Sequence, residues 1–113
     1  MKKELYAIND GQKTEYRTVT GYTERIETKN GYIFIGYDFR KDIRRWIATD
    51  LKTGLAVSPS TEKKKDNVVA FVHRNAEFIH GLIEKALTEK NQYSIGSFRL
   101  WVNERNLNQT YYE

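Results

Sequence analysis

A chain of 113 residues has the size of one domain, and 13% aromatic residues favour a thin core built largely from rings. The chain contains no cysteine, which excludes a disulfide framework and a thiolate metal site. The basic start has no apolar segment behind it, and no apolar run approaches the ~18 residues of a membrane span. These features predict a soluble cytoplasmic protein without a membrane partner. The net charge of +4 permits binding to polyanions without requiring it.

The first strands are predicted by β-forming runs that end in turn signals. Residues 5–8 are predicted to form a short strand, which Asn9-Asp10-Gly11 would end. Residues 16–28 are rich in threonine, tyrosine, valine and isoleucine but lack a clean apolar face, which is typical of a half-exposed or edge strand. Gly21 within this run could form a bulge.

The next run predicts the centre of a sheet. Asn30-Gly31 would supply both positive-φ positions of a type I′ turn, so we expect a hairpin there. Residues 32–39 are apolar on both faces and should form a central strand that is covered on each side. Gly36 inside this strand indicates a bulge or a close approach by another group.

Two further short strands are predicted at residues 46–49 and 55–57. The turn between them ends at Gly54, which we expect in the left-handed conformation. Pro59 should end the second of these strands, because proline cannot donate to a strand ladder.

A long amphipathic helix is predicted to begin near Thr61 or Asp66, both acceptable N-caps, and to fray near residues 90–91. Its apolar positions recur every three or four residues: Val68, Val72, Ala76, Ile79, Leu82, Ile83 and Ala86. Asn75 lies near this stripe and would mark a kink, a break into two helices or a polar contact at the edge of the core. Residues 97–102 have the composition of a last strand.

This order of elements predicts an α+β fold, an antiparallel meander of four to five strands with one long amphipathic helix packed on a face. The core of the fold would be a β-β-β-α unit. Residues 1–102 would form this single domain, and residues 103–113 a polar, flexible tail.

The strongest candidate site combines basic and aromatic residues. Cations fall on the connection after the central strand, between Phe39 and Trp46, and again at the predicted start of the helix: Arg40, Lys41, Arg44, Arg45, Lys63, Lys64 and Lys65. Hairpin loops and the helix start can share one edge of a β-β-β-α unit, so the two groups could meet and neutralise phosphates. The strand order, and nothing beyond it, resembles that of sheet-plus-helix DNA-binding modules such as the arm-binding domains of tyrosine recombinases. The alternative is ordinary solvation of a hairpin tip and a lysine run.

A second candidate lies on the predicted helix. His73, Glu77, His80 and Glu84 fall within one narrow stripe, at a spacing that could chelate a divalent metal. Charge on an exposed helix face is more often solvation, so we expect neither a metal site nor a cofactor.

No pattern supports catalysis, because cysteine is absent, the serines lack a nucleophile signature and the glycines are scattered. We therefore expect a small non-enzymatic binding or regulatory protein, with DNA or RNA as the favoured ligand class. The alternative is a protein-interaction module, either a homodimer or an inhibitor of a partner protein, that uses an unpaired sheet edge. We expect both Trp46 and Trp101 in the core.

Overall fold

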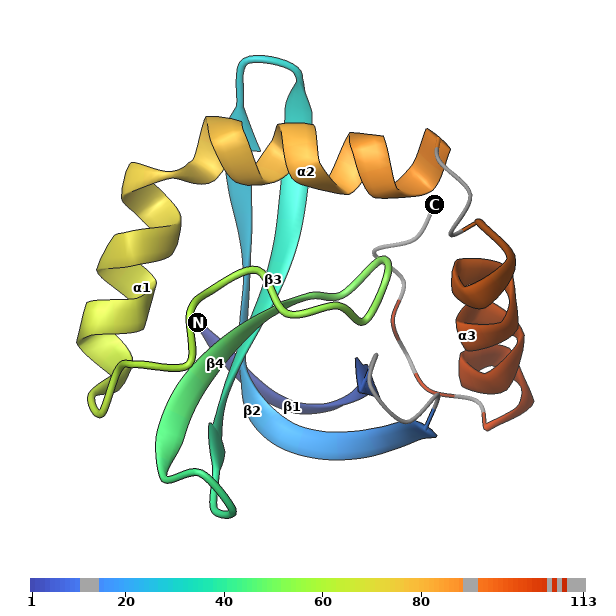
Figure 1. Cartoon of the computed structure of the whole chain (residues 1–113), viewed down its shortest axis with the longest axis horizontal. Coiled ribbons are helices and arrows are strands. Elements are labelled where there is room, and N and C mark those ends of the chain that lie inside the picture. Colours follow the sequence, from blue (N-terminus) through green and yellow to red (C-terminus); the bar gives the residue numbers. More distant parts are fainter. Residues whose placement is uncertain (11–14, 89–91, 106, 108, 110–113) are drawn as a thin grey trace.

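The computed structural model describes residues 1–10, 15–88, 92–105, 107 and 109. Four antiparallel strands form one sheet in chain order, and helices follow them (Figure 1). The strands are β1 (Lys2–Asp10), β2 (Glu15–Thr28), β3 (Gly31–Arg40) and β4 (Arg45–Asp50). The helices are α1 (Lys65–Arg74), α2 (Ala76–Thr88) and α3 (Gln92–Glu104). Within the described residues, no helix is long and apolar enough to cross a membrane.

The antiparallel meander and the central position of β3 are confirmed, since β3 pairs with β2 on one side and β4 on the other. β1 is longer than predicted: it includes Asn9 and Asp10, while Gly11 lies outside the described residues. β2 pairs with β1 along its first part and with β3 along its second part. The predicted bulge at Gly21 is wrong, because the pairing with β1 runs without interruption through the Glu4–Gly21 pair.

The two predicted turns differ in how closely the structure follows them. The β2–β3 hairpin is confirmed, but its type I′ turn is wrong, since only Gly31 of the expected pair has a positive φ, 127°. In the turn after β4, Gly54 has a φ of 75°, as expected. The carboxylate of Asp50 organises that turn by accepting hydrogen bonds from the Thr53 amide at 2.9 Å and hydroxyl at 2.7 Å.

The predicted single long helix is wrong, because the chain breaks into α1 and α2 at Asn75. The φ of −112° and ψ of 18° at Asn75 lie outside the helical region, and the side-chain amide of Asn75 donates to the carbonyl of Phe71 at 2.8 Å. Asparagine competes with helical hydrogen bonding in this way. The expected N-caps are also wrong, since Lys64 occupies the cap position without a side-chain hydrogen bond and Asp66 lies in the first turn.

The predicted strand at 97–102 is wrong, because these residues belong to α3. Phe98, Leu100 and Val102 fit a two-residue period, but Leu100 is 60% exposed while Phe98 and Val102 are buried. Ile95 is buried with them, which gives the spacing of three and four that a helix requires.

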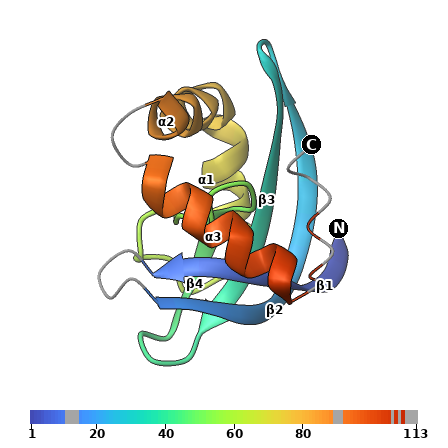
Figure 2. The ribbon, with the colours of Figure 1, turned by 90° about the vertical axis from the view of Figure 1, so that its right-hand side faces the viewer.

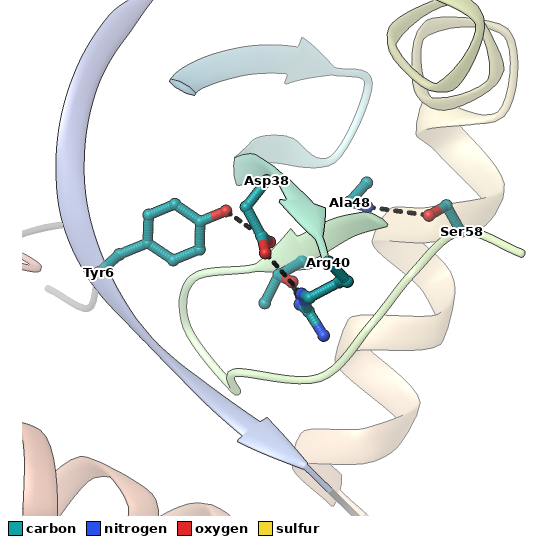
Figure 3. A network of polar contacts seen from close by, with 6 residues as sticks. Tyr6, Asp38, Arg40, Ala48 and Ser58 are labelled. Carbon is teal, nitrogen blue, oxygen red and sulfur yellow. Dashed lines mark hydrogen bonds and ion pairs between the residues drawn. The ribbon is translucent and has the colours of Figure 1, made fainter. Parts of the chain in front are cut away.

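The predicted strand at 55–57 is also wrong: residue 56 makes a single bridge to Thr49. The segment nevertheless covers the outer edge of β4. The Val57 amide donates to the carbonyl of Ala48 at 2.9 Å, and the Ala48 amide donates to the hydroxyl of Ser58 at 2.9 Å (Figure 3). Loop residues therefore satisfy polar groups that would otherwise leave β4 open for strand pairing.

Helices α1 and α2 pack on one face of the sheet through the largest apolar cluster. Its buried members are Ile26, Ile33, Ile35, Tyr37, Ala48, Val68, Val72, Ala76, Ile79 and Ile83. Both tryptophans are half-buried: Trp46 packs against this cluster, and Trp101 packs against the cluster that joins α3 to β1. Leu82, predicted in the apolar stripe, is 43% exposed.

The opposite face of β3 is covered by Tyr6 of β1, which lies across two glycines. A Cβ at Gly36 would sit 2.5 Å from the ring, and one at Gly21 would sit 2.9 Å from the hydroxyl. The close approach predicted at Gly36 is therefore confirmed. Figure 2 shows β1 and the start of β2 turned strongly away from the direction of β3.

The chain after α3 adds a contact of its own to β1. Gln109 is buried, its side-chain oxygen accepts from the Ala7 amide at 2.9 Å, and its side-chain nitrogen donates to the Leu51 carbonyl at 3.2 Å. The flexibility of residues 103–113 stays a prediction.

Candidate nucleic-acid interface

A cleft opens where β2 and β3 separate. Their ladder ends at the Tyr22–Tyr37 pair, and beyond it β2 continues only alongside β1. The space between the two strands has a volume of about 660 Å³ and is lined by Arg17, Thr18, Val19, Thr20, Asp38, Phe39, Arg40, Lys41 and Asp42. The sheet thus places residues from two distant strands around one recess.

Asp38 and Arg40 of the cleft lining belong to a polar network (Figure 3). The hydroxyl of Tyr6 donates to Asp38 Oδ1 at 3.0 Å, and Nε of Arg40 donates to Asp38 Oδ2 at 2.5 Å. Tyr6 is fully buried and Asp38 is 2% exposed. Burial and the neighbouring Asp38 carboxylate both raise the pKa of Tyr6, so its hydroxyl remains a donor at neutral pH.

Arg40 is held in place by this network. Besides its contact with Asp38, its Nη2 donates to the hydroxyl of Thr49 at 3.3 Å, and its side chain is 15% exposed. The ion pair cancels the charge of Arg40, so this residue adds little to the field over the surface. It instead presents a fixed guanidinium to the cleft, whose remaining N–H groups can donate to a ligand.

The rim of the cleft carries exposed charge. Arg17 from β2 and Lys41 from the β3–β4 hairpin are exposed cations, and Asp42 is an exposed carboxylate beside them. The same hairpin holds the other two predicted arginines. Arg44 is exposed with a φ of 54°, and Arg45 is partly buried and donates from Nη1 to the Arg44 carbonyl at 2.9 Å.

Aromatic rings lie next to the cleft, on the α1 side of the sheet. Phe39 is 43% exposed and packs against Trp46, with ring centroids 5.9 Å apart. Trp46 in turn lies 6.5 Å from the ring of Tyr22. The ammonium of Lys65 stands 4.1 Å over the Tyr22 ring, which makes Lys65 a partly buried cation–π partner.

The predicted lysine run reaches the same end of the sheet. The backbone amide of Trp46, at the start of β4, donates to the carbonyl of Glu62 at 2.8 Å. Lys63 and Lys64 follow Glu62 directly and are exposed. The loop that leads into α1 therefore passes beside the β3–β4 hairpin, as Figure 1 shows.

We call residues 38–45 and 62–66, together with Arg17, the basic end. It contains eight cationic and four acidic side chains. Since the whole chain has a formal net charge of +4, the charges outside the basic end cancel. The residues of the basic end together carry a formal net charge of +4, equal to that of the whole chain.

The histidine and glutamate stripe has a different arrangement from a metal centre. Two of its members contact residues outside the stripe: Nε2 of His73 lies 3.1 Å from Glu24, and Glu77 accepts from the Lys29 amide. The other two, His80 and Glu84, lie 3.9 Å from each other. In the described part of the chain, no group of three or more histidine, aspartate or glutamate side chains is placed to hold a metal ion.

Sequence reasoning missed Arg17 and the Tyr6–Asp38 contact. Arg17 belongs to a strand without a local cluster of cations, and Tyr6 and Asp38 are 32 residues apart. The sequence signal for the position of Tyr6 is the pair of glycines beside it, Gly21 and Gly36. A glycine in a strand, however, does not specify which group approaches it.

Comparisons with known protein families, with curated proteins and with solved structures find no match for this chain. Its function is therefore inferred from its own residues and their geometry.

Proposed function

We propose that this protein binds nucleic acid, DNA or RNA, through the basic end and has no catalytic activity. One observation carries the proposal: exposed cations from two segments about twenty residues apart gather beside an exposed aromatic ring and a polar cleft. Cations in such a cluster neutralise backbone phosphates and release counterions. The ring and the cleft add surfaces that can contact bases.

The arrangement distinguishes three roles among the cationic side chains. Arg17, Lys41, Arg44, Lys63 and Lys64 are exposed and supply phosphate contacts. Arg40 donates to a ligand inside the cleft, since Asp38 already neutralises its charge. Arg45 and Lys65 are partly buried and support the hairpin and the Tyr22 ring.

The test is a fluorescence-anisotropy titration of labelled DNA and RNA oligonucleotides at several salt concentrations. The variant Lys63→Ala/Lys64→Ala should bind every sequence more weakly and lower the slope of log affinity against log salt by about two. A matched control is Lys29→Ala/Arg74→Ala, which removes the same charge from exposed positions outside the basic end. Equal losses in the two variants, or no binding at 50 mM salt, would contradict the proposal.

A second candidate is a protein-interaction module that receives an extended peptide in the cleft. Backbone groups alternate in an antiparallel ladder, so those of Thr18, Thr20 and Phe39 point toward the cleft beyond the last β2–β3 pair. A strand added there would find partners for its own backbone. A homodimer formed in this way would have twice the 13.3 kDa mass in size-exclusion chromatography with light scattering, and a monomer would exclude it.

The outer edge of β1 is less available than a typical edge strand. The Ala7 amide donates to Gln109, and the Asn9 amide donates to the Gly54 carbonyl at 2.8 Å. With β4 covered by the segment that follows it, these contacts favour the cleft over either outer edge as a place for strand addition.

A further inference from the structure

We propose that the ligand of the basic end is a single strand, one of whose bases stacks on the ring of Phe39. This inference rests on the nucleic-acid function proposed above and specifies the form of the ligand. The evidence for a single strand is the position of Phe39. This residue is exposed, lines the cleft and packs on one side against Trp46.

The ring of Phe39 is backed by a second ring, that of Trp46. Phe39 and Trp46 are directly opposite each other in the β3–β4 ladder, and their planes are inclined by 48°. Trp46 is itself anchored against the apolar cluster under α1. A base that covers Phe39 therefore gains contact area without ordering a flexible side chain.

Cations flank this ring on two sides. Arg17 and Lys41 stand at the cleft rim, and Lys63 and Lys64 follow the residue that is hydrogen-bonded to Trp46. A strand that crosses Phe39 would have phosphates near both groups. Alternation of an exposed aromatic face with backbone-neutralising cations is the arrangement that favours single strands without a strict sequence requirement.

The recess next to Phe39 discriminates against a duplex. Inside a duplex the base faces are covered by their neighbours, so only the two terminal base pairs could cover an aromatic ring. A rigid duplex could contact the exposed rim cations, but Arg40 lies inside the cleft with only 15% of its side chain exposed. An unpaired base can enter and accept hydrogen bonds from Arg40 or from the backbone of Thr18, Thr20 and Phe39.

The experiment uses the full chain with Trp101→Phe, which leaves Trp46 as the reporter of tryptophan fluorescence. Three ligands of equal length are titrated: an oligothymidylate of ten nucleotides, the same strand without bases, and a ten-base-pair duplex. We expect the oligothymidylate to quench Trp46 and to bind more tightly than the other two. Phe39→Ala should weaken its binding by about fivefold to 150-fold, and leave the strand without bases within about twofold.

Tyr32→Ala is the matched control. Tyr32 is an exposed ring on the same strand, 48% exposed and stacked under Arg25, but it lies at the other end of β3. It should leave every affinity within about twofold. Phe39→Leu keeps the apolar bulk and should lose most of the same binding, so a change in stability cannot account for the result. Thermal unfolding of each variant verifies that it folds.

The outcomes separate the two proposals. Equal binding of the three ligands, with Phe39→Ala no weaker than Tyr32→Ala, would overturn the single-strand inference and leave nucleic-acid binding in place. Tighter binding of the duplex than of the oligothymidylate would also overturn the single-strand inference and leave nucleic-acid binding in place. Failure of all three to bind at 50 mM salt would overturn both.

Discussion

Replacing Tyr6 by phenylalanine should lower the free energy of unfolding by about 2 kcal/mol. The substitution removes one oxygen atom and leaves the ring in place over Gly36. What is lost is the 3.0 Å hydrogen bond to Asp38, a carboxylate that is 2% exposed. A buried charge that loses a donor has no water to replace it.

The expected magnitude follows from how much of the Asp38 network survives. Hydrogen bonds to charged groups contribute roughly 1.5–3 kcal/mol. Arg40 still pairs with the other carboxylate oxygen in the variant, so Asp38 is not left as an isolated charge. The loss should therefore be smaller than the roughly 3–5 kcal/mol that follows removal of one member of a buried ion pair.

Urea unfolding at pH 7, followed by circular dichroism, measures this change. Tyr37→Phe is the control, because its hydroxyl donates to Glu24 at 2.7 Å, and the Glu24 side chain is 16% exposed and also contacts His73. That variant should lose about 1 kcal/mol. A loss below about 0.5 kcal/mol for Tyr6→Phe, or a larger loss for Tyr37→Phe, would refute the assignment of the network as a buried, tightly satisfied unit.

Three other substitutions test separate features. Gly36→Ala should cost about 3 kcal/mol in urea unfolding, because its Cβ would lie 2.5–2.8 Å from ring atoms of the fully buried Tyr6. Burial raises the pKa of Asp50 despite the hydrogen bonds from Thr53. The stability that the protonated Asp50 contributes is therefore fully present below the pKa that Asp50 has in the unfolded chain, and it is lost as the pH rises through the pKa of Asp50 in the folded protein. Asp50→Asn should remove this loss, so the melting temperature of the variant minus that of the parent should be higher at pH 7 than at pH 4; an unchanged difference would contradict it. Arg44→Gly should raise the free energy of unfolding by up to about 1 kcal/mol, since φ is 54° there, and still weaken DNA binding.

Local signals in the sequence predicted the parts of the fold that depend on a few neighbouring residues. The hairpin before β3, the left-handed Gly54 and the disturbance at Asn75 were all visible in this way. The central position of β3 followed from its apolar character on both faces, which only an interior strand can bury.

The remaining features depend on contacts between distant residues. Residues 97–102 satisfy a strand period and a helix period equally over six positions, and burial of Phe98 and Val102 beside Ala7 selects the helix. The cleft exists because β2 pairs with β3 only from Tyr22 onward, and no local pattern in β2 specifies where this pairing begins. Tertiary packing therefore determines the secondary structure of residues 97–102 and the pairing of β2, which the periodicity of the sequence does not specify.

The cleft and the stability of the sheet share one physical origin. Gly36 leaves room for the Tyr6 ring against the sheet, the Tyr6 hydroxyl donates to Asp38, and Asp38 holds Arg40 at the cleft. The energy of a buried ion pair is a poor stabiliser, since desolvation offsets much of the attraction. Its benefit lies in orientation: an unpaired arginine would lose side-chain freedom on binding a ligand, whereas Arg40 is already ordered. The network therefore makes better sense as a device that presents a guanidinium to the cleft than as a means of stabilising the sheet.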